Sequence, residues 1–197
     1  LTTMFSWPIS ISTVICRSKP LDEALRAVAK AGFKYVEIFP GHASQLAKQD
    51  YRKLLQELDL AIGTIHLPFV RMDISDLDGG KRQQVLDELA RIVAIAPLYE
   101  VPIIILHPNS YSRVADQVDF ALRQEAFSKS VDWLLPHAEK ANARFAIENM
   151  IGPRGTRFGG FADEVIDWVR EQDNPLLTVC IDTCHAILNE EEVVPAV

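Results

Sequence analysis

The chain has 197 residues, of which 48% are hydrophobic and 24% are charged. This composition is typical of one folded domain with a sizeable buried core. The net charge of −7 gives no general attraction for phosphate backbones, so nucleic acid is not an expected partner. Three cysteines favour a reducing compartment over a disulfide scaffold, and we expect a cytoplasmic protein. No apolar run reaches the length of a membrane span, so no membrane contact is expected.

Six short runs rich in β-branched residues recur along the chain. They cover residues 9–15, 35–39, 61–66, 103–107, 144–148 and 177–182. We interpret these runs as strands with apolar residues on both faces, as in strands that are buried on both sides of a parallel sheet. The sequence therefore predicts six buried parallel strands.

Amphipathic helical patterns separate these runs. In four of them apolar residues recur at positions i, i+4, i+7 and i+8, which places one apolar stripe on each helix. These patterns start at Leu21, Val85, Phe127 and Phe161, and a shorter one covers residues 51–58. Residues from Ala186 onward indicate the start of a sixth helix. We therefore expect five helices between the six strands.

Strands that alternate with helices fit two α/β architectures, an open doubly wound sheet and a (β/α)8 TIM barrel. A doubly wound sheet usually builds its site from a few strand ends, whereas at least four successive strands end here on chemically capable residues. Only a closed ring brings all of these ends to one axis, so we expect a TIM barrel. Eight units need about 250 residues, so only about six strand–helix units are present.

We expect residues 1–197 to form a single barrel domain that is incomplete at its C-terminus. A six-stranded arc would leave its first and last strands without a neighbour, and exposed apolar edges promote aggregation. The sequence therefore predicts two further strand–helix units after Val197, or a partner subunit that covers the edges.

Four strand ends carry residues that can bind a metal ion. His66, His107, Glu148 and Asp182 follow one another at intervals of 41, 41 and 34 residues, roughly one strand–helix unit per step. A buried carboxylate is costly unless it is paired or metal-bound. A salt bridge or helix cap is the alternative for the carboxylates, and a hydrogen-bonded core position is the alternative for each histidine. Together the four predict a site for Mn²⁺, Zn²⁺, Co²⁺, Mg²⁺ or Fe²⁺.

Four further residues are predicted to bind substrate. His185 follows Asp182 by three residues and can face the same cavity from the loop. Glu37 ends the second strand, and a structural role is its alternative. The loop over residues 152–160 carries Arg154 and Arg157, which can clamp a phosphate or carboxylate group. A solvated loop explains these two arginines almost as well.

Other reactive residues are predicted to have no catalytic role. Cys180 and Cys184 are interpreted as packing residues, and His42 and His137 are expected at the surface. The sequence contains no glycine-rich phosphate loop, no dinucleotide fingerprint and no Gly-x-Ser-x-Gly elbow.

The chain resembles the superfamily of xylose isomerase-like barrels, which includes sugar and sugar-phosphate isomerases and epimerases and metal-dependent abasic-site endonucleases. The resemblance covers essentially the whole chain. It is carried, in this order, by His66-Leu-Pro, His107-Pro-Asn, Ile147-Glu148-Asn149 and Asp182-Thr-Cys-His185. In the isomerase branch it implies that Glu148 is a metal ligand and acid/base, that Asp182 is a metal ligand and that His185 contacts the substrate. In the endonuclease branch the resemblance implies that one metal cluster is bound by five residues, namely His66, His107, Glu148, Asp182 and His185.

The resemblance favours a metal-dependent isomerase or epimerase that transfers protons through an enediolate, with Glu148 as the proton-transfer group and a small sugar or sugar phosphate as substrate. The abasic-site endonuclease is the alternative. The loop over residues 70–78 contains one arginine and three aspartates, and this acidity argues against DNA. A metal-dependent lyase or dehydratase and a non-catalytic sugar or metal sensor also stay open, as does the choice between a monomer and a homo-oligomer.

Overall fold

Six parallel strands form one sheet in the computed structural model, which describes residues 8–110 and 117–191. The strands are β1 (Ser10–Ser12), β2 (Tyr35–Ile38), β3 (Ala61–His66), β4 (Ile103–Leu106), β5 (Arg144–Glu148) and β6 (Leu177–Cys180). Each strand pairs with its neighbour in the sequence, in the order β1 to β6. A doubly wound sheet reverses its order at a switch point, whereas a TIM barrel keeps the sequence order. The predicted barrel topology is therefore confirmed, with six strand–helix units.

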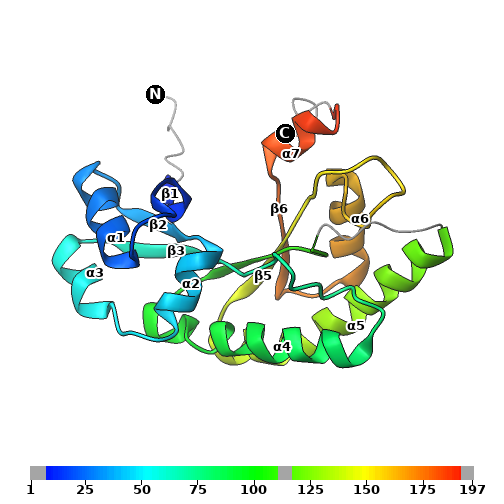
Figure 1. The fold of residues 1–197 in the computed structure, drawn as a ribbon, viewed down its shortest axis with the longest axis horizontal. Coiled ribbons are helices and arrows are strands. Elements are labelled where there is room, and N and C mark those ends of the chain that lie inside the picture. The colour runs from blue at the N-terminus through cyan, green and yellow to red at the C-terminus, as the bar shows by residue number, and fades with distance from the viewer. Residues whose placement is uncertain (1–7, 111–116, 192–197) are drawn as a thin grey trace.

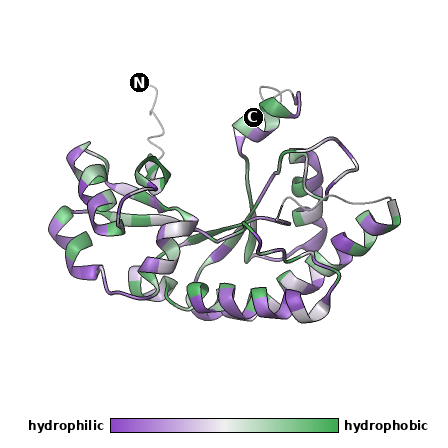
Figure 2. Cartoon of the chain, in the orientation of Figure 1, coloured by the Kyte–Doolittle hydropathy of each residue, from purple (hydrophilic) through white to green (hydrophobic). Residues whose placement is uncertain are grey.

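The five helices that the sequence predicts between the strands are present. They are α1 (Leu21–Lys30), α3 (Arg52–Leu58), α4 (Gly79–Val93), α5 (Gln117–Ala141) and α6 (Ala162–Gln172). They lie along the outer side of the curved sheet, and α7 (Thr183–Leu188) lies on the opposite side of the sheet from α4 and α5 (Figure 1). The strands are mostly apolar and the helices carry both polar and apolar residues (Figure 2).

The hydrophobic core fills the space between the sheet and these helices. Its largest fully buried side chains include Phe127 and Leu134 of α5, Phe145 of β5 and Ile65 of β3. Each such side chain stabilises the fold by about 1.5–3 kcal/mol relative to an exposed position. Because the inner strands β3, β4 and β5 are packed in this way, their carboxyl ends are held at fixed positions relative to one another.

Both edge strands are shorter and more exposed than predicted. The first strand ends at Ser12 because the Ser12 hydroxyl accepts a hydrogen bond from the N–H of Val14 at 3.3 Å and caps a 3₁₀ helix, η1 (Thr13–Cys16). The sixth strand ends at Cys180, two residues before the predicted end at Asp182. An edge strand has a neighbour on one side only, so the prediction that all six strands are fully buried is wrong for β1 and β6.

The loop after β2 contains a helix that the sequence analysis missed, α2 (Pro40–Leu46). Its His42 is 1% exposed, and its ring nitrogen Nε2 lies 2.9 Å from the carbonyl oxygen of Lys19. The prediction that His42 lies at the surface is therefore wrong, because α2 packs against the start of α1. His137 is half-buried beside Trp133 on α5. A second 3₁₀ helix, η2 (Ala96–Tyr99), precedes β4.

The helix after β6 begins at Thr183, three residues before the expected start at Ala186. It ends at Leu188, earlier than predicted, and residues 192–197 lie outside the described residues. None of the described helices is both long and apolar enough to cross a membrane.

Candidate metal centre

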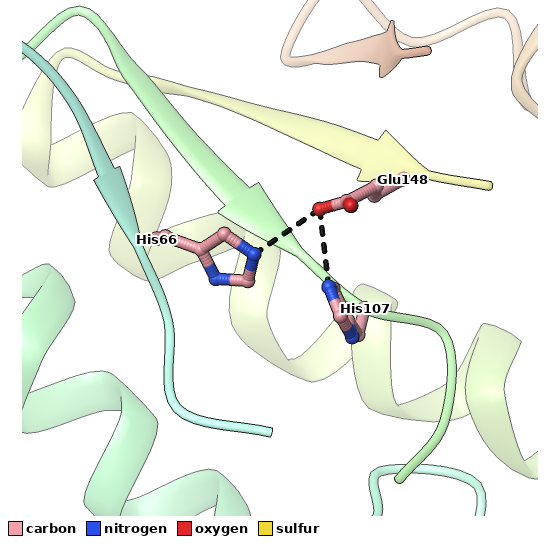
Figure 3. Close-up of side chains that lie close together, drawn as sticks. All are labelled: His66, His107 and Glu148. Atoms are coloured by element: carbon pink, nitrogen blue, oxygen red, sulfur yellow. Dashed lines mark hydrogen bonds and ion pairs between the residues drawn. The ribbon is translucent and has the colours of Figure 1, made fainter. Parts of the chain in front are cut away.

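Three predicted ligands meet at the carboxyl ends of the inner strands. His66 is the last residue of β3, His107 follows β4 directly, and Glu148 is the last residue of β5. The parallel register aligns β3 with β4 and β4 with β5, so these ends lie at one level. The Oε2 atom of Glu148 lies 3.1 Å from Nε2 of His66 and 3.0 Å from Nε2 of His107 (Figure 3). One carboxylate oxygen is therefore shared by two imidazole rings.

The hydrogen bonds of His66 show which of its atoms is available as a ligand. Its Nδ1 lies 2.9 Å from the carbonyl oxygen of Leu67, and a carbonyl only accepts, so Nδ1 carries a proton. The Nε2 atom then faces Oε2 of Glu148, and two lone pairs at this distance repel unless a cation lies between them. A proton or a metal ion supplies that cation, which fits the donor chemistry of a metal site.

Charge and burial shift the three pKa values in different directions. Burial alone would raise the pKa of Glu148, but the hydrogen bonds from His107 and His66 outweigh it and hold that pKa well below its usual range. Burial opposes protonation of His66, yet the bond to Glu148 wins and raises its pKa. For His107 burial wins, and its pKa is lowered. Protonation of His66 is therefore favoured over protonation of His107.

A second group of ligand atoms lies beyond β6. Asp182 is the N-cap of α7, where its Oδ1 accepts hydrogen bonds from the N–H groups of Cys184 at 2.7 Å and His185 at 2.9 Å. Nδ1 of His185 lies 3.6 Å from both Oε1 of Glu148 and Oδ2 of Asp182. Asp182 is thus a helix cap that also faces Glu148, in place of the strand end that the sequence predicts.

The two groups share Glu148 and together can accept metal ions. Ligand atoms of His66, His107 and Glu148 lie within 4.8 Å of one another, and so do those of Glu148, Asp182 and His185. Two ligands of a tetrahedral ion with bonds of about 2.0–2.1 Å lie roughly 3.3 Å apart, close to the distances between Glu148 and the histidines. Imidazole nitrogen and carboxylate oxygen suit divalent transition metals. The residues present therefore fit a divalent cation.

A pocket of about 470 Å³ opens over these ligands. This volume lies within the range of small-molecule sites. Its wall is partly apolar, formed by Val14, Phe39, Phe69, Ile105 and Ile181. Its polar lining consists of Ser12, Glu37, His66, His107, Glu148, Asp182, Thr183 and His185, together with the thiol of Cys180. Burial raises the pKa of the Cys180 thiol to about 12, so this side chain is neutral in the pocket.

The predicted substrate-binding residues divide into two sets. His185 and Glu37 line the pocket, and Glu37 accepts a hydrogen bond of 3.4 Å from the hydroxyl of Thr64. Arg154 and Arg157 do not line it. Arg154 forms a 3.0 Å ion pair with Asp163 at the start of α6 and lies 3.9 Å above the ring of Phe161.

Arg157 is likewise engaged within its own loop, where its Nη1 donates a hydrogen bond of 2.8 Å to the carbonyl oxygen of Ile151. The structure therefore does not bring the two arginines to the metal ligands. Arg154 is attracted by the acidic residues in the first turn of α6. This contact forms because the loop that carries Arg154 folds back onto that helix.

Two residues of the site were assigned no role from sequence. The ring of Phe69 stacks on His107, with centroids 4.0 Å apart and planes inclined by 23°. Asn149 is fully buried directly after Glu148 and bonds to the Asp182 segment. A polar residue that follows a buried strand was a usable signal for Asn149, whereas an apolar residue in the loop after His66 gave none for Phe69.

Comparisons with known proteins found relatives in sequence and in fold. The chain is 26% identical over 196 residues to an uncharacterized protein of Methanocaldococcus jannaschii, which covers 96% of this chain and 70% of the relative. It is 22% identical over 139 residues to a probable endonuclease 4 of Mycoplasma mobile, which covers 70% of this chain and 45% of the relative.

A crystal structure of D-psicose 3-epimerase in the presence of D-fructose has a similar fold. The TM-score is 0.75 at 18% identity, over 93% of this chain and 66% of the epimerase. The chain thus spans just under two thirds of that enzyme and less than half of the endonuclease. The sequence model described as xylose isomerase-like TIM barrel matches residues 25–196. The chain therefore belongs to the xylose isomerase-like TIM-barrel family.

Proposed function

We propose that the protein is a divalent-metal-dependent isomerase or epimerase of sugars or sugar phosphates. The observation that carries this proposal is the position of Glu148, whose Oε2 faces His66 and His107 while its Oε1 faces His185. This carboxylate lies in a pocket of a size suited to a small molecule. Similarity to the fold of a sugar epimerase supports the same class of substrate.

Two groups of side chains would hold the metal. His66, His107 and Glu148 form one, and Glu148, Asp182 and His185 form the other. A bound divalent ion would act as a Lewis acid that polarises the substrate carbonyl and stabilises the negative charge that develops on its oxygen. The sharing of Glu148 makes this residue the one on which both groups depend.

The side chains of the pocket have distinct proposed roles. Glu148, ionised because its pKa is lowered, removes the proton from the carbon next to the substrate carbonyl and leaves an enediolate. Protonation of the opposite face of that carbon by a second acid gives an epimer, whereas transfer of the proton from Glu148 to the neighbouring carbon gives an isomer. His185 and Glu37 bind substrate hydroxyls, and the apolar wall around Phe39 and Phe69 excludes water. Substrate contact by Arg154 and Arg157 stays a prediction.

Deuterium exchange tests the proposed chemistry directly. The full-length protein is incubated in deuterated water with Mn²⁺, Co²⁺, Zn²⁺ or Mg²⁺ and a panel of ketoses, aldoses and their phosphates. We expect deuterium at the carbon next to the carbonyl and formation of an epimer or isomer, both detected by proton NMR. Glu148→Gln should reduce exchange by at least about 10³-fold, since it removes the proton-transfer group.

A surface carboxylate provides the control for that variant. Glu125 pairs with Lys129 on the exposed side of α5, so Glu125→Gln makes the same chemical change far from the pocket. This variant should exchange as the wild type does. Absence of exchange with every sugar and every metal would overturn the proposal.

An abasic-site endonuclease is the second candidate. It is supported by the pair of histidines on Glu148 and by the similarity to a probable endonuclease 4. The net charge of −7 and the aspartates at positions 76 and 78 oppose a DNA-binding surface. Cleavage of a duplex that contains an abasic site, without deuterium exchange in any sugar, would favour this candidate.

A further inference from the structure

Asn149 is a buried residue to which the proposed function assigns no role. It follows Glu148 at the end of β5 and is 0% exposed. A buried amide requires hydrogen-bond partners. All four polar groups of Asn149, two in the side chain and two in the main chain, find their partners on one segment. That segment runs from the end of β6 into α7 and contains Cys180, Asp182 and His185.

The side chain of Asn149 pairs with the backbone of Asp182 in both directions. Its Oδ1 accepts a hydrogen bond of 2.6 Å from the N–H of Asp182, and its Nδ2 donates one of 3.1 Å to the carbonyl oxygen of Asp182. The regular β5–β6 ladder ends at the pair of Glu148 and Cys180. The Asn149 amide therefore continues the pairing of the two segments beyond the end of the strands.

The main chain of Asn149 ties down the residues on either side of Asp182. Its N–H donates to the carbonyl oxygen of Cys180 at 3.3 Å. Its carbonyl oxygen accepts a hydrogen bond of 2.7 Å from Nδ1 of His185. Because a carbonyl only accepts, Nδ1 carries the proton in this bond, and the bond fixes the orientation of the His185 ring beside Glu148 and Asp182.

We infer that Asn149 is a positioning residue that holds Asp182 and His185 beside Glu148, so that the three side chains stay together as one group of candidate ligands. The inference rests on the proposed metal site. In the described part of the chain the Asn149 side chain bonds only to Asp182, so its loss should affect the Asp182–His185 group. His66 and His107 are held by β3 and β4 and should keep their geometry.

Titration with Co²⁺ alone tests the inference, followed by calorimetry and by the visible absorption of the bound ion. The wild type should bind two ions per chain. Asn149→Ala should weaken the binding of one ion by about 10–100-fold, the range seen when an outer contact of a metal ligand is removed. The affinity for the other ion should change by less than about threefold, and its spectrum should be unchanged.

A second variant answers the objection that alanine disturbs folding. Asn149→Asp keeps the shape of the side chain, but a carboxylate cannot donate to the carbonyl oxygen of Asp182. The added negative charge by itself would strengthen cation binding. Weaker binding of one ion in this variant would therefore come from the altered positions of the candidate ligands Asp182 and His185. Stronger or unchanged binding of both ions in both variants would overturn the inference.

Asn189 provides the matched control. Its side chain also joins the loop after β5 to the segment that follows α7, through the carbonyl oxygens of Met150 and Gly160 and the N–H of Gly152. It makes no side-chain bond to Asp182 or His185 in the described residues. Asn189→Ala should therefore leave both Co²⁺ affinities within about threefold of the wild type, and an equal loss in this variant would contradict a specific role for Asn149.

Hydrogen exchange of the metal-free protein separates this inference from the proposed function. The N–H of Asp182 should exchange about tenfold faster in Asn149→Ala than in the wild type, because its acceptor is lost. A wild type that binds no Co²⁺ would contradict the proposed metal dependence. The exchange rate of the Asp182 N–H in Asn149→Ala would still test whether Asn149 holds this segment in place. Unchanged exchange at Asp182 would overturn that role.

Discussion

The two halves of the candidate metal centre are built in different ways. His66, His107 and Glu148 lie at the ends of neighbouring inner strands, and their side chains are at most 13% exposed. Asp182 lies in a loop beyond an edge strand, and its side chain is 33% exposed. Strand pairing alone aligns the first half. The second half needs a helix cap and the Asn149 contacts, because no ladder extends to its residues.

Two groups with the same ligand chemistry can therefore differ in rigidity. A ligand at the end of a packed inner strand is fixed by the core, so its position is stabilised by the whole fold. A ligand in a loop is fixed by a few local bonds, so single substitutions can release it. We therefore expect the His66–His107 half to tolerate changes in the loops and the Asp182 half to be sensitive to them.

The largest expected effect removes the residue that both halves share. Glu148→Gln should weaken the binding of both Co²⁺ ions by more than about 100-fold, which corresponds to roughly 2.7 kcal/mol per site. His66→Gln and Asp182→Asn should each weaken one ion only. Calorimetric titration of the three variants measures this, with Glu125→Gln as the unaffected control. Retention of both ions in Glu148→Gln would refute a shared ligand.

A substitution next to His107 tests the rigidity of the strand-borne half. Gly159 has φ +73°, and a Cβ atom there would lie 2.7 Å from Cγ of Pro108. Gly159→Ala combines left-handed strain with overpacking and should lower the free energy of unfolding by about 2–4 kcal/mol. Gly32 has φ +87° with nothing within 4 Å of a Cβ atom, so Gly32→Ala should cost only about 1–2 kcal/mol.

Urea unfolding of the metal-free variants gives these values. If the strands hold His107 firmly, folded Gly159→Ala should still bind the ion of the His66 group with little loss. If both glycine substitutions lowered the free energy of unfolding equally, the contact with Pro108 would not contribute to stability.

Two substitutions at Asp182 separate its structural role as a helix cap from its proposed role as a metal ligand. Asparagine is as good an N-cap as aspartate, whereas alanine cannot accept the hydrogen bonds from Cys184 and His185. Asp182→Ala should therefore be about 1 kcal/mol less stable than Asp182→Asn in the metal-free state, while both lose the same Co²⁺ ion. Thermal and urea unfolding measure the difference. Equal stability of the two variants would show that the cap does not stabilise α7.

The smallest expected effect is a pH dependence of opposite sign for the two histidines. The raised pKa of His66 gives stability that is present below pH 6.5 and is lost as the pH rises through the folded-state pKa. The lowered pKa of His107 gives the reverse, with stability present above pH 6.5 and lost as the pH falls through its folded-state pKa. Metal-free His66→Gln should therefore lose more stability at pH 5.5 than at pH 8, and His107→Gln should lose more at pH 8.

Urea unfolding at the two pH values checks the sign for each variant. Losses with the same pH dependence in both variants would contradict the opposite pKa shifts of His66 and His107. Metal ligands must be deprotonated, so Co²⁺ competes with the proton for these side chains. Addition of Co²⁺ should therefore remove the pH dependence of wild-type stability only at pH values where the ion outcompetes the proton.

The amino-acid sequence was sufficient to predict the barrel topology, the five helices between the strands and three candidate ligands at strand ends. Apolar β-branched runs and amphipathic stripes are local patterns, and parallel strands in sequence order bring their carboxyl ends to one side of the sheet. That is sufficient to predict that His66, His107 and Glu148 meet. The sequence pattern was less reliable at the two edges of the sheet. There β1 and β6 each lack a second neighbouring strand and end earlier than the apolar runs predict.

Only the tertiary structure decided how the remaining residues are used. The capping role of Asp182, the four bonds of Asn149, the pairing of Arg154 with Asp163 and the burial of His42 all depend on which segments pack together. Such contacts join residues outside the repeating pattern, and their partners are chosen by loop conformation. A spacing pattern can place a residue at the end of a strand, but the direction of its side chain follows from the packing of the whole chain.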